Sequence, residues 1–92
     1  MNLKSHGEKH AEWMQDPEYR AAYEDEMRRE RLRDMLAEWR SHENLTSREV
    51  ARRMGVTPST VSKMENNVTR TSLDTLYRYA KACHVPNPVI VL

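Results

Sequence analysis

The first regular pattern along the chain is a helix-start signal in residues 16 to 18. Asp16 can accept a backbone N–H bond as the N-cap, and Pro17 suits the first helical position because no N–H is needed there. The helix that begins here is expected to end near Asn44, since Asn tolerates the left-handed conformation that closes many helices.

Apolar side chains mark one face of this predicted helix, but the face changes direction once. They fall at Tyr19, Tyr23, Met27, Leu32, Leu36 and Trp39. The five-residue step after Met27 rotates the apolar stripe by more than a full turn. One straight helix cannot aim both parts at the same small core, so either the helix bends or its front part faces elsewhere.

Two shorter amphipathic helices follow, at residues 46 to 54 and 57 to 66. Thr46 opens the first with a capping box, and Thr57, followed by a proline, opens the second. Gly55 permits the sharp reversal between them. The side chains expected to face inward are Val50, Ala51, Met54, Val61 and Met64.

The last predicted helix is capped by Thr71 or Ser72, after a boundary at residues 66 and 67 where Asn suits a positive φ. Its core face is expected to comprise Leu73, Leu76, Ala80 and Cys83. The prolines that follow break the helix, and residues 89 to 92 are β-branched enough for a strand. The whole pattern predicts an all-α fold of about five helices, with an N-terminal helical extension and a short C-terminal strand.

Composition sets the size and setting of this fold. The sequence has 92 residues, 38% of them hydrophobic and 32% charged, which is enough for one small core and an extension. No apolar run approaches the roughly 18 to 20 residues of a membrane helix, and the N-terminus lacks a secretory-signal pattern, so we expect a cytoplasmic protein without membrane contact. Residues 1 to 15 are polar and unpatterned and are expected to be mobile. The single Cys83 cannot form an internal disulfide and suits a packed position.

Charge is divided unevenly along the chain, although its formal net charge is only +1. Residues 1 to 44 hold eight Lys or Arg and eleven Asp or Glu, a balance of −3, whereas residues 45 to 92 hold seven and three, a balance of +4. The two halves are therefore expected to face different partners. The alternative is that each charge run is simply a solvated helix face.

The helix at residues 57 to 66 has an outward face of short polar side chains without an acid. Pro58, Ser59, Thr60, Ser62, Lys63 and Asn66 lie on this face or at its leading end. Hydroxyl groups and a Lys let a helix backbone sit deep in the DNA major groove and offer donors and acceptors to base edges, whereas a carboxylate would be repelled by phosphates. The preceding helix begins with Ser47, Arg48 and Arg52, which are phosphate-binding residue types. The two helices together predict a unit that binds duplex DNA.

The stretch LTSREVARRMGVTPSTVSKMENN, residues 45 to 67, resembles the helix-turn-helix of the phage-repressor and Cro class, also called the XRE family. TSLDTLYRYAKAC resembles the next helix of that class, and the likeness covers roughly residues 30 to 85. The resemblance implies base reading by Pro58, Ser59, Thr60, Lys63 and Ser62. It implies phosphate contacts at Ser47, Thr57, Asn66 and Arg70, and a structural pair between Arg40 and Glu65.

Three departures from the family pattern affect the expected DNA sequence. The family often has Gln where this chain has Ser47, Pro58 and Ser59. Without those amides, the bidentate reading of adenine by Gln is absent, so the family's operators do not carry over. Pro58 either touches a thymine methyl group or simply starts the helix.

The front half resembles a narrower group. DPEYRAAYEDEMRRERLRDMLAEWR resembles the front portion of HigA-type antitoxins, small XRE proteins that inhibit a ribonuclease toxin and repress the operon they share. An aromatic and Met stripe beside acidic residues can dock on a basic protein. The expected contacts with a HigB/RelE-like toxin are Trp13, Met14, Tyr19, Tyr23, Glu24 and Met27. The alternative is that the apolar members of this set pack on their own domain or on a twin subunit.

An enzymatic role and a cofactor are not expected. His6 and His10 are one helical turn apart and could share a metal, but Gly7 separates them and no third ligand lies nearby in the sequence. No nucleophile with an adjacent base and no Gly-rich phosphate loop is present.

The sequence thus predicts three segments: a toxin-contacting extension at 1–29, an XRE-type domain at 30–85 and a tail at 86–92. The expected function is that of a DNA-binding antitoxin that also represses its own operon, bound as a homodimer to a two-fold operator. The alternative is a phage-type transcriptional regulator without a toxin partner.

Overall fold

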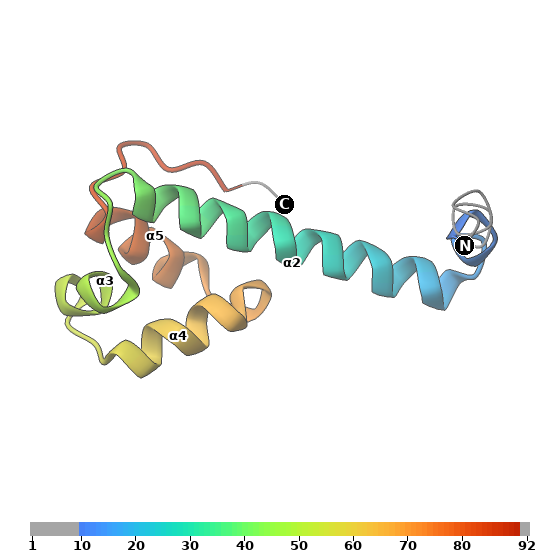
Figure 1. The fold of residues 1–92 in the computed structure, drawn as a ribbon, viewed down its shortest axis with the longest axis horizontal. Helices are drawn as coiled ribbons and strands as arrows, with labels where there is room; N and C mark the ends of the chain where they lie inside the picture. The colour runs from blue at the N-terminus through green and yellow to red at the C-terminus, as the bar shows by residue number, and fades with distance from the viewer. Residues whose placement is uncertain (1–9, 91–92) are drawn as a thin grey trace, which may run out of the picture.

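The computed structural model describes residues 10–90, and the regular structure in that range is helical (Figure 1). The elements are α2 (Pro17–Ser41), α3 (Ser47–Met54), α4 (Pro58–Asn66), the short 3-10 helix η1 (Val68–Arg70) and α5 (Leu73–Ala82), with residues 10–13 also helical. The all-α expectation is confirmed. No helix in the described range is both long enough and apolar enough to cross a membrane.

The expected C-terminal strand is wrong for the described part of the tail. Val89 and Ile90 form no strand, and residues 91 and 92 lie outside the described range. Ile90 packs against the hydrophobic core instead, as does Val85. A strand needs a neighbour to pair its backbone groups, and no strand occurs among residues 10–90. The tail therefore covers the helices as irregular chain.

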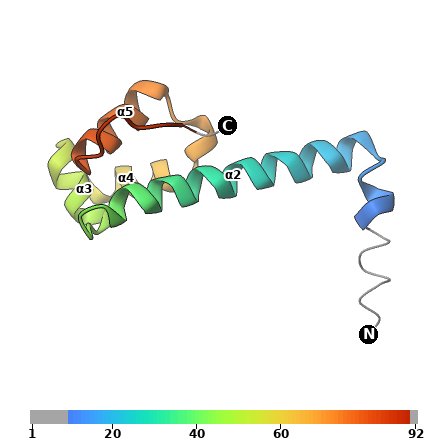
Figure 2. The same ribbon diagram turned by 90° about the horizontal axis from the view of Figure 1, so that it is seen from above.

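α2 is one continuous helix of 25 residues, about 37 Å long at the usual rise. Asp16 caps it as predicted, since the Asp16 carboxylate accepts the N–H of Glu18 at 2.9 Å. Its buried side chains all lie in the C-terminal half and are Leu32, Met35, Leu36 and Trp39. Of the two alternatives, the front part facing away from the core is the one observed. Figures 1 and 2 show this part of α2 extending beyond α3, α4 and α5.

Local hydrogen bonds start the three shorter helices at the predicted residues. Thr46 and Thr57 each accept, at 3.2 Å, the N–H of the residue three positions later. Ser72, rather than Thr71, does the same for α5 at 3.1 Å. Gly55 closes α3 with φ at 73° and so reverses the chain toward α4. These turns place α3 and α4 against each other as a helix-turn-helix.

Two of the three expected positive-φ asparagines behave differently from the expectation. Asn44 does have a positive φ, at 54°. Asn66 is still helical and Asn67 has φ at −120°, so the expectation was wrong at this boundary. The side-chain amide of Asn67 instead donates to the carbonyl of Lys63 at 3.1 Å. The backbone N–H of Asn67 donates to the same carbonyl at 2.9 Å, so this helix end is closed by Asn67 without a left-handed residue.

The core lies between the C-terminal half of α2 and the other helices. Its buried side chains are Leu32, Met35, Leu36, Trp39, Leu45, Val50, Ala51, Val61, Met64, Val68, Leu76, Tyr79, Ala80, Ala82 and Cys83, with Met54 partly buried beside them. Burial raises the pKa of the Cys83 thiol to about 11, which favours the packed, protonated role expected for it. Leu73 departs from the predicted core face and is 67% exposed. It is the first residue of α5, and helical spacing alone does not say how far along a helix the core extends.

Candidate nucleic-acid interface

α4 presents opposite faces to the core and to solvent. Val61 is fully buried and Met64 is 8% exposed, and both belong to the core. The predicted base-reading side chains are all exposed, namely Pro58, Ser59, Thr60, Ser62 and Lys63. The amphipathic direction inferred from the sequence is therefore the direction observed. Contact of these side chains with DNA bases remains a prediction.

The leading end of this face has an internal hydrogen bond. The hydroxyl oxygens of Thr57 and Thr60 lie 2.8 Å apart, so each can orient the other. Thr57 is also the N-cap of α4, which holds its side chain at the start of the helix. Lys63 lies one helical turn further along and has no ion-pair partner within residues 10–90. Its ammonium group is available to an acceptor outside the protein.

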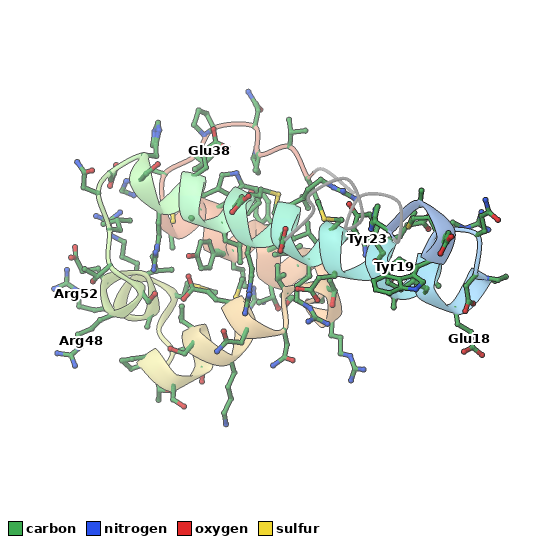
Figure 3. The ribbon with its side chains drawn as sticks, turned by 45° about the vertical axis from the view of Figure 1, so that its right-hand side comes forward. Glu18, Tyr19, Tyr23, Glu38, Arg48 and Arg52 are labelled. Carbon is green, nitrogen blue, oxygen red and sulfur yellow. The ribbon has the colours of Figure 1, made fainter. Side chains whose placement is uncertain are left out.

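α3 adds two uncompensated cations beside this face. Arg48 and Arg52 are one turn apart, exposed, and without an ion pair among the described residues. Figure 3 shows both side chains pointing outward from α3. Arg53 has a different role, because it donates to Glu43 and to the carbonyl of Ala82, both at 2.8 Å. The hydrogen bond from Arg53 holds the pKa of the Glu43 carboxyl below its usual value, and that from His84 acts in the same direction.

The implied pair of Arg40 and Glu65 is present as part of a larger network. Arg40 and Glu65 approach to 3.4 Å. Ser47 lies between them, accepting from Arg40 and donating to Glu65 at 2.7 Å. The Tyr79 hydroxyl donates to the other Glu65 oxygen at 3.0 Å. The network ties α2, the start of α3, the end of α4 and α5 together.

This network changes what Ser47 can offer to a phosphate. The Ser47 hydroxyl has a single hydrogen, which it donates to Glu65. A phosphate needs donors, so a contact at this position would use the backbone N–H at the start of α3.

Burial raises the pKa of Tyr79 above its usual range, and the nearby Glu65 charge acts in the same direction, which keeps the Tyr79 donor protonated.

The other two predicted phosphate contacts lie near the end of α4. Asn66 is exposed, and its side-chain oxygen accepts from Arg33 of α2 at 3.3 Å. Arg70 is exposed at the end of η1 and makes no ion pair in the described part of the chain. Arg33 was not among the residues predicted for this site. The two partners of this bond are 33 residues apart, and no local pattern signals such a meeting.

An aromatic cluster occupies the other end of α2. His10 lies 4.8 Å from Tyr23 between ring centroids, and its Nδ1 is 3.1 Å from the Tyr19 hydroxyl. Trp13 lies 5.4 Å from Tyr19. Figure 3 shows Tyr19 and Tyr23 at the opposite end of the molecule from Arg48 and Arg52. The two predicted interfaces are therefore spatially separate.

The remaining predicted toxin contacts border this cluster along the chain. Met14 and Met27 are half-buried, Glu24 is exposed, and Trp13 is 49% exposed. None of the predicted toxin contacts belongs to the core. In the described part of the segment 1–15, residues 10–13 form a helical turn that contacts α2 through its aromatic rings. The expected mobility of this segment stays a prediction.

The sequence offers His10 as a metal ligand only together with His6, which lies outside the described residues. The structure instead places His10 against two tyrosines. In the described range, no three His, Cys, Asp or Glu side chains are grouped so as to hold a metal ion.

Comparison with known proteins agrees with this geometry. A family model described as helix-turn-helix matches residues 36–86, which include all of α3, α4, η1 and α5. The chain belongs to this helix-turn-helix family. The implied pair of Arg40 and Glu65 and the predicted base-reading residues all lie inside the matched region.

Two curated relatives confirm the narrower resemblance. The chain is 43% identical over 67 residues to Antitoxin HigA1 of Mycobacterium tuberculosis strain CDC 1551 / Oshkosh, and equally to Antitoxin HigA1 of strain ATCC 25618 / H37Rv. Each match covers 73% of this chain and 45% of the relative, so the chain spans less than half the length of these relatives. A comparison with solved structures gave no significant match.

Proposed function

We propose that this helix-turn-helix protein is a DNA-binding antitoxin that represses its own operon and neutralises a ribonuclease toxin of the HigB/RelE-like class. The observation that carries the proposal is the outward face of α4. Ser59, Ser62 and Lys63 are exposed on this face, while Val61 and Met64 of the same helix are buried in the core. Membership of the helix-turn-helix family and the identity to Antitoxin HigA1 support it.

In the proposed complex, α4 enters the major groove. Lys63 can donate to the O6 and N7 acceptors of guanine. The hydroxyls of Ser59 and Ser62 can donate to or accept from the base edges of both A·T and G·C pairs. Arg48 and Arg52 bind phosphates on the flanking backbone, which fixes the register of α4 but carries no sequence information. The α3 N-terminus adds backbone N–H groups beside them.

The operator in this proposal is two-fold and the protein binds it as a homodimer. One recognition helix reads too few base pairs for useful selectivity, and paired half-sites are the usual solution. Leu73 and Tyr77 are one turn apart on α5 and are 67% and 55% exposed. We propose that a second copy covers them, because exposed apolar side chains at helical spacing supply the area that a dimer buries.

The proposed toxin contact uses the front of α2. Trp13, Tyr19 and Tyr23 supply aromatic area, and Glu24 supplies negative charge that attracts a basic partner. The relatives' printed name, antitoxin, supports this assignment. Because α2 carries this surface away from α3 and α4 (Figure 2), a toxin and an operator can be bound at separate places.

The test is a salt-controlled binding titration with the promoter duplex of the protein's own operon. Lys63→Ala should weaken operator binding by about 1 to 3 kcal/mol if Lys63 reads a base. Arg31→Ala is the control, because Arg31 is an exposed cation on α2, outside α3, α4 and the proposed dimer face of α5. Equal affinity of the wild type for the promoter and for an unrelated duplex would refute operator recognition, and an unchanged affinity in Lys63→Ala would remove this residue from the site.

A phage-type regulator without a toxin is the second candidate. The observation in its favour is that His10, Tyr19 and Tyr23 already pack against one another, so these rings have partners within the chain. Co-expression with the product of the adjacent gene separates the two candidates. Co-purification of a small basic protein supports the antitoxin, and operator binding without any such partner supports the plain regulator.

A further inference from the structure

Four arginines gather beside the C-terminal end of α4, and none of them is a predicted base-reading residue. They are Arg28, Arg29 and Arg33 of α2 and Arg70 of η1, and we refer to them as the flank cluster. Three of the four precede residue 36, where the helix-turn-helix match begins. The family pattern therefore assigns these three no role.

Three members of the flank cluster line a polar hollow between α2 and η1. The cavity has a volume of about 230 Å³ and is lined by Asp25, Arg28, Arg29, Thr69 and Arg70. α2 and η1 are in contact along this edge. The hollow is thus formed by two elements that the fold brings together, with guanidinium groups on both sides.

Arg33 joins this hollow to the outward face of α4. Its guanidinium donates to the side-chain oxygen of Asn66 at 3.3 Å. Asn66 lies three residues after Lys63 on α4 and shares its outward face. A duplex held against that face would continue past Asn66 toward Arg33 and the rest of the flank cluster.

The four arginines of the flank cluster outnumber the two carboxylates that pair with them. Arg28 pairs with Asp25 at 3.4 Å and Arg29 with Glu26 at 3.2 Å. Both are exposed pairs within one helical turn, with 44 to 68% of each side chain accessible, and such pairs are weak enough to exchange for another anion. Arg33 and Arg70 have no ion-pair partner within residues 10–90.

We infer that the flank cluster binds backbone phosphates of the duplex just outside the base pairs that α4 reads, so that α2 extends the DNA interface beyond the helix-turn-helix. The inference rests on the proposed binding of DNA by α4. Guanidinium groups suit this ligand because their planar fork can hold two phosphate oxygens at once. A duplex is favoured over an acidic protein because the cluster continues the α4 face through the bond between Arg33 and Asn66.

The experiment compares the full chain with the double variant Arg33→Ala/Arg70→Ala on the promoter duplex over a series of salt concentrations. Removing one phosphate-binding arginine should make the slope of log K against log salt less negative by about 0.9. The slope of the double variant should therefore be less negative than that of the wild type by about two units. Arg31→Ala is the matched control, because Arg31 lies on the same helix but lines a different groove, with Trp39 and Val89.

A second measurement locates the contacts. The duplex is shortened stepwise from its ends while the sequence read by α4 is kept. The wild type and Arg31→Ala should lose affinity when the flanking phosphates are removed, whereas the double variant should be insensitive to the same shortening. Thermal unfolding of each variant checks that these exposed substitutions leave the fold intact.

The outcomes are distinguishable from failure of the proposed function. If Lys63→Ala weakens binding but the double variant keeps the wild-type slope, the flank cluster does not bind DNA and operator recognition stands. Equal losses on shortening, in the wild type and the double variant, also overturn the inference. Loss of toxin binding in the double variant with an unchanged salt slope would assign the cluster to the toxin contact instead. If the wild type binds the promoter no better than an unrelated duplex, the proposed function itself fails.

Discussion

Glu65 is the residue on which the polar contacts inside the domain converge. Its two oxygens accept from Ser47 of α3 and Tyr79 of α5, and Arg40 of α2 is its ion-pair partner at 3.4 Å. The Tyr79 side chain is fully buried, so its hydroxyl depends on this carboxylate for a partner. A charge at this position therefore sets how four helices meet.

Glu65→Ala is expected to lower the free energy of unfolding by about 2 to 3 kcal/mol, because it leaves the Arg40 charge without its ion-pair partner and the buried Tyr79 hydroxyl without its acceptor. Tyr79→Phe removes only one hydrogen bond and should cost about 1 kcal/mol. Chemical denaturation of both variants measures the difference. Equal, small losses would show that the network contributes little to stability.

At the scale of elements, the two halves of α2 contact different parts of the protein. Its C-terminal half contributes Leu36 and Trp39 to the core, while its front half carries Tyr19 and Tyr23 and meets residues 10–13. The helical spacing of the sequence showed that these two faces differ. The helix continues without a break, so its front half is joined to the helix-turn-helix through regular helical structure.

Tyr23→Ala is expected to weaken toxin binding while leaving operator binding by the free protein nearly unchanged, because Tyr23 lies outside the core and away from α4. Inhibition of the toxin's ribonuclease activity and a band shift on the promoter measure the two effects. Trp13→Ala supplies a second probe, since this ring is 49% exposed and its loss opens no cavity in the core. Equal loss of both activities in Tyr23→Ala would indicate a folding role.

At the scale of the whole molecule, the described chain is elongated, with extents of 48 × 26 × 26 Å. The proposed DNA surface and the proposed toxin surface lie at different places along its long axis (Figure 1). The three α2 members of the flank cluster, Arg28, Arg29 and Arg33, lie between them along the helix. A toxin bound at the aromatic cluster would therefore approach the proposed phosphate contacts, and the salt slope measured with and without toxin reports whether the two compete.

Leu73→Glu tests the proposed dimer. The substitution places a charge where a second copy is proposed to pack, so it should shift the protein toward monomer and lower operator affinity at low protein concentration. Thermal stability of the monomer should change little, because Leu73 is 67% exposed. Sedimentation analysis measures the oligomeric state. A variant that remains dimeric would exclude this face of α5.

Much of the helix-turn-helix was predictable because its signals are local. The hydroxyls of Thr46 and Thr57 each bond to a backbone group three residues away, and Gly55 adopts the left-handed conformation that its lack of a side chain permits. The outward direction of Ser59 and Lys63 follows from the same helical repeat that buries Val61. Such features depend on neighbours in sequence and not on the rest of the fold.

The sequence by itself thus determined where the helices begin and which face of α4 is polar. It also determined that the apolar side chains of the N-terminal half of α2 face a different direction from those of its C-terminal half. Only the tertiary structure decided that the Ser47 hydroxyl belongs to an internal network, that Leu73 lies outside the core, and that Arg33 meets Asn66. The physical reason is the distance along the sequence over which each interaction acts. Caps and helical faces arise from interactions across three or four residues, whereas these three outcomes depend on how whole helices pack, which no short stretch of sequence encodes.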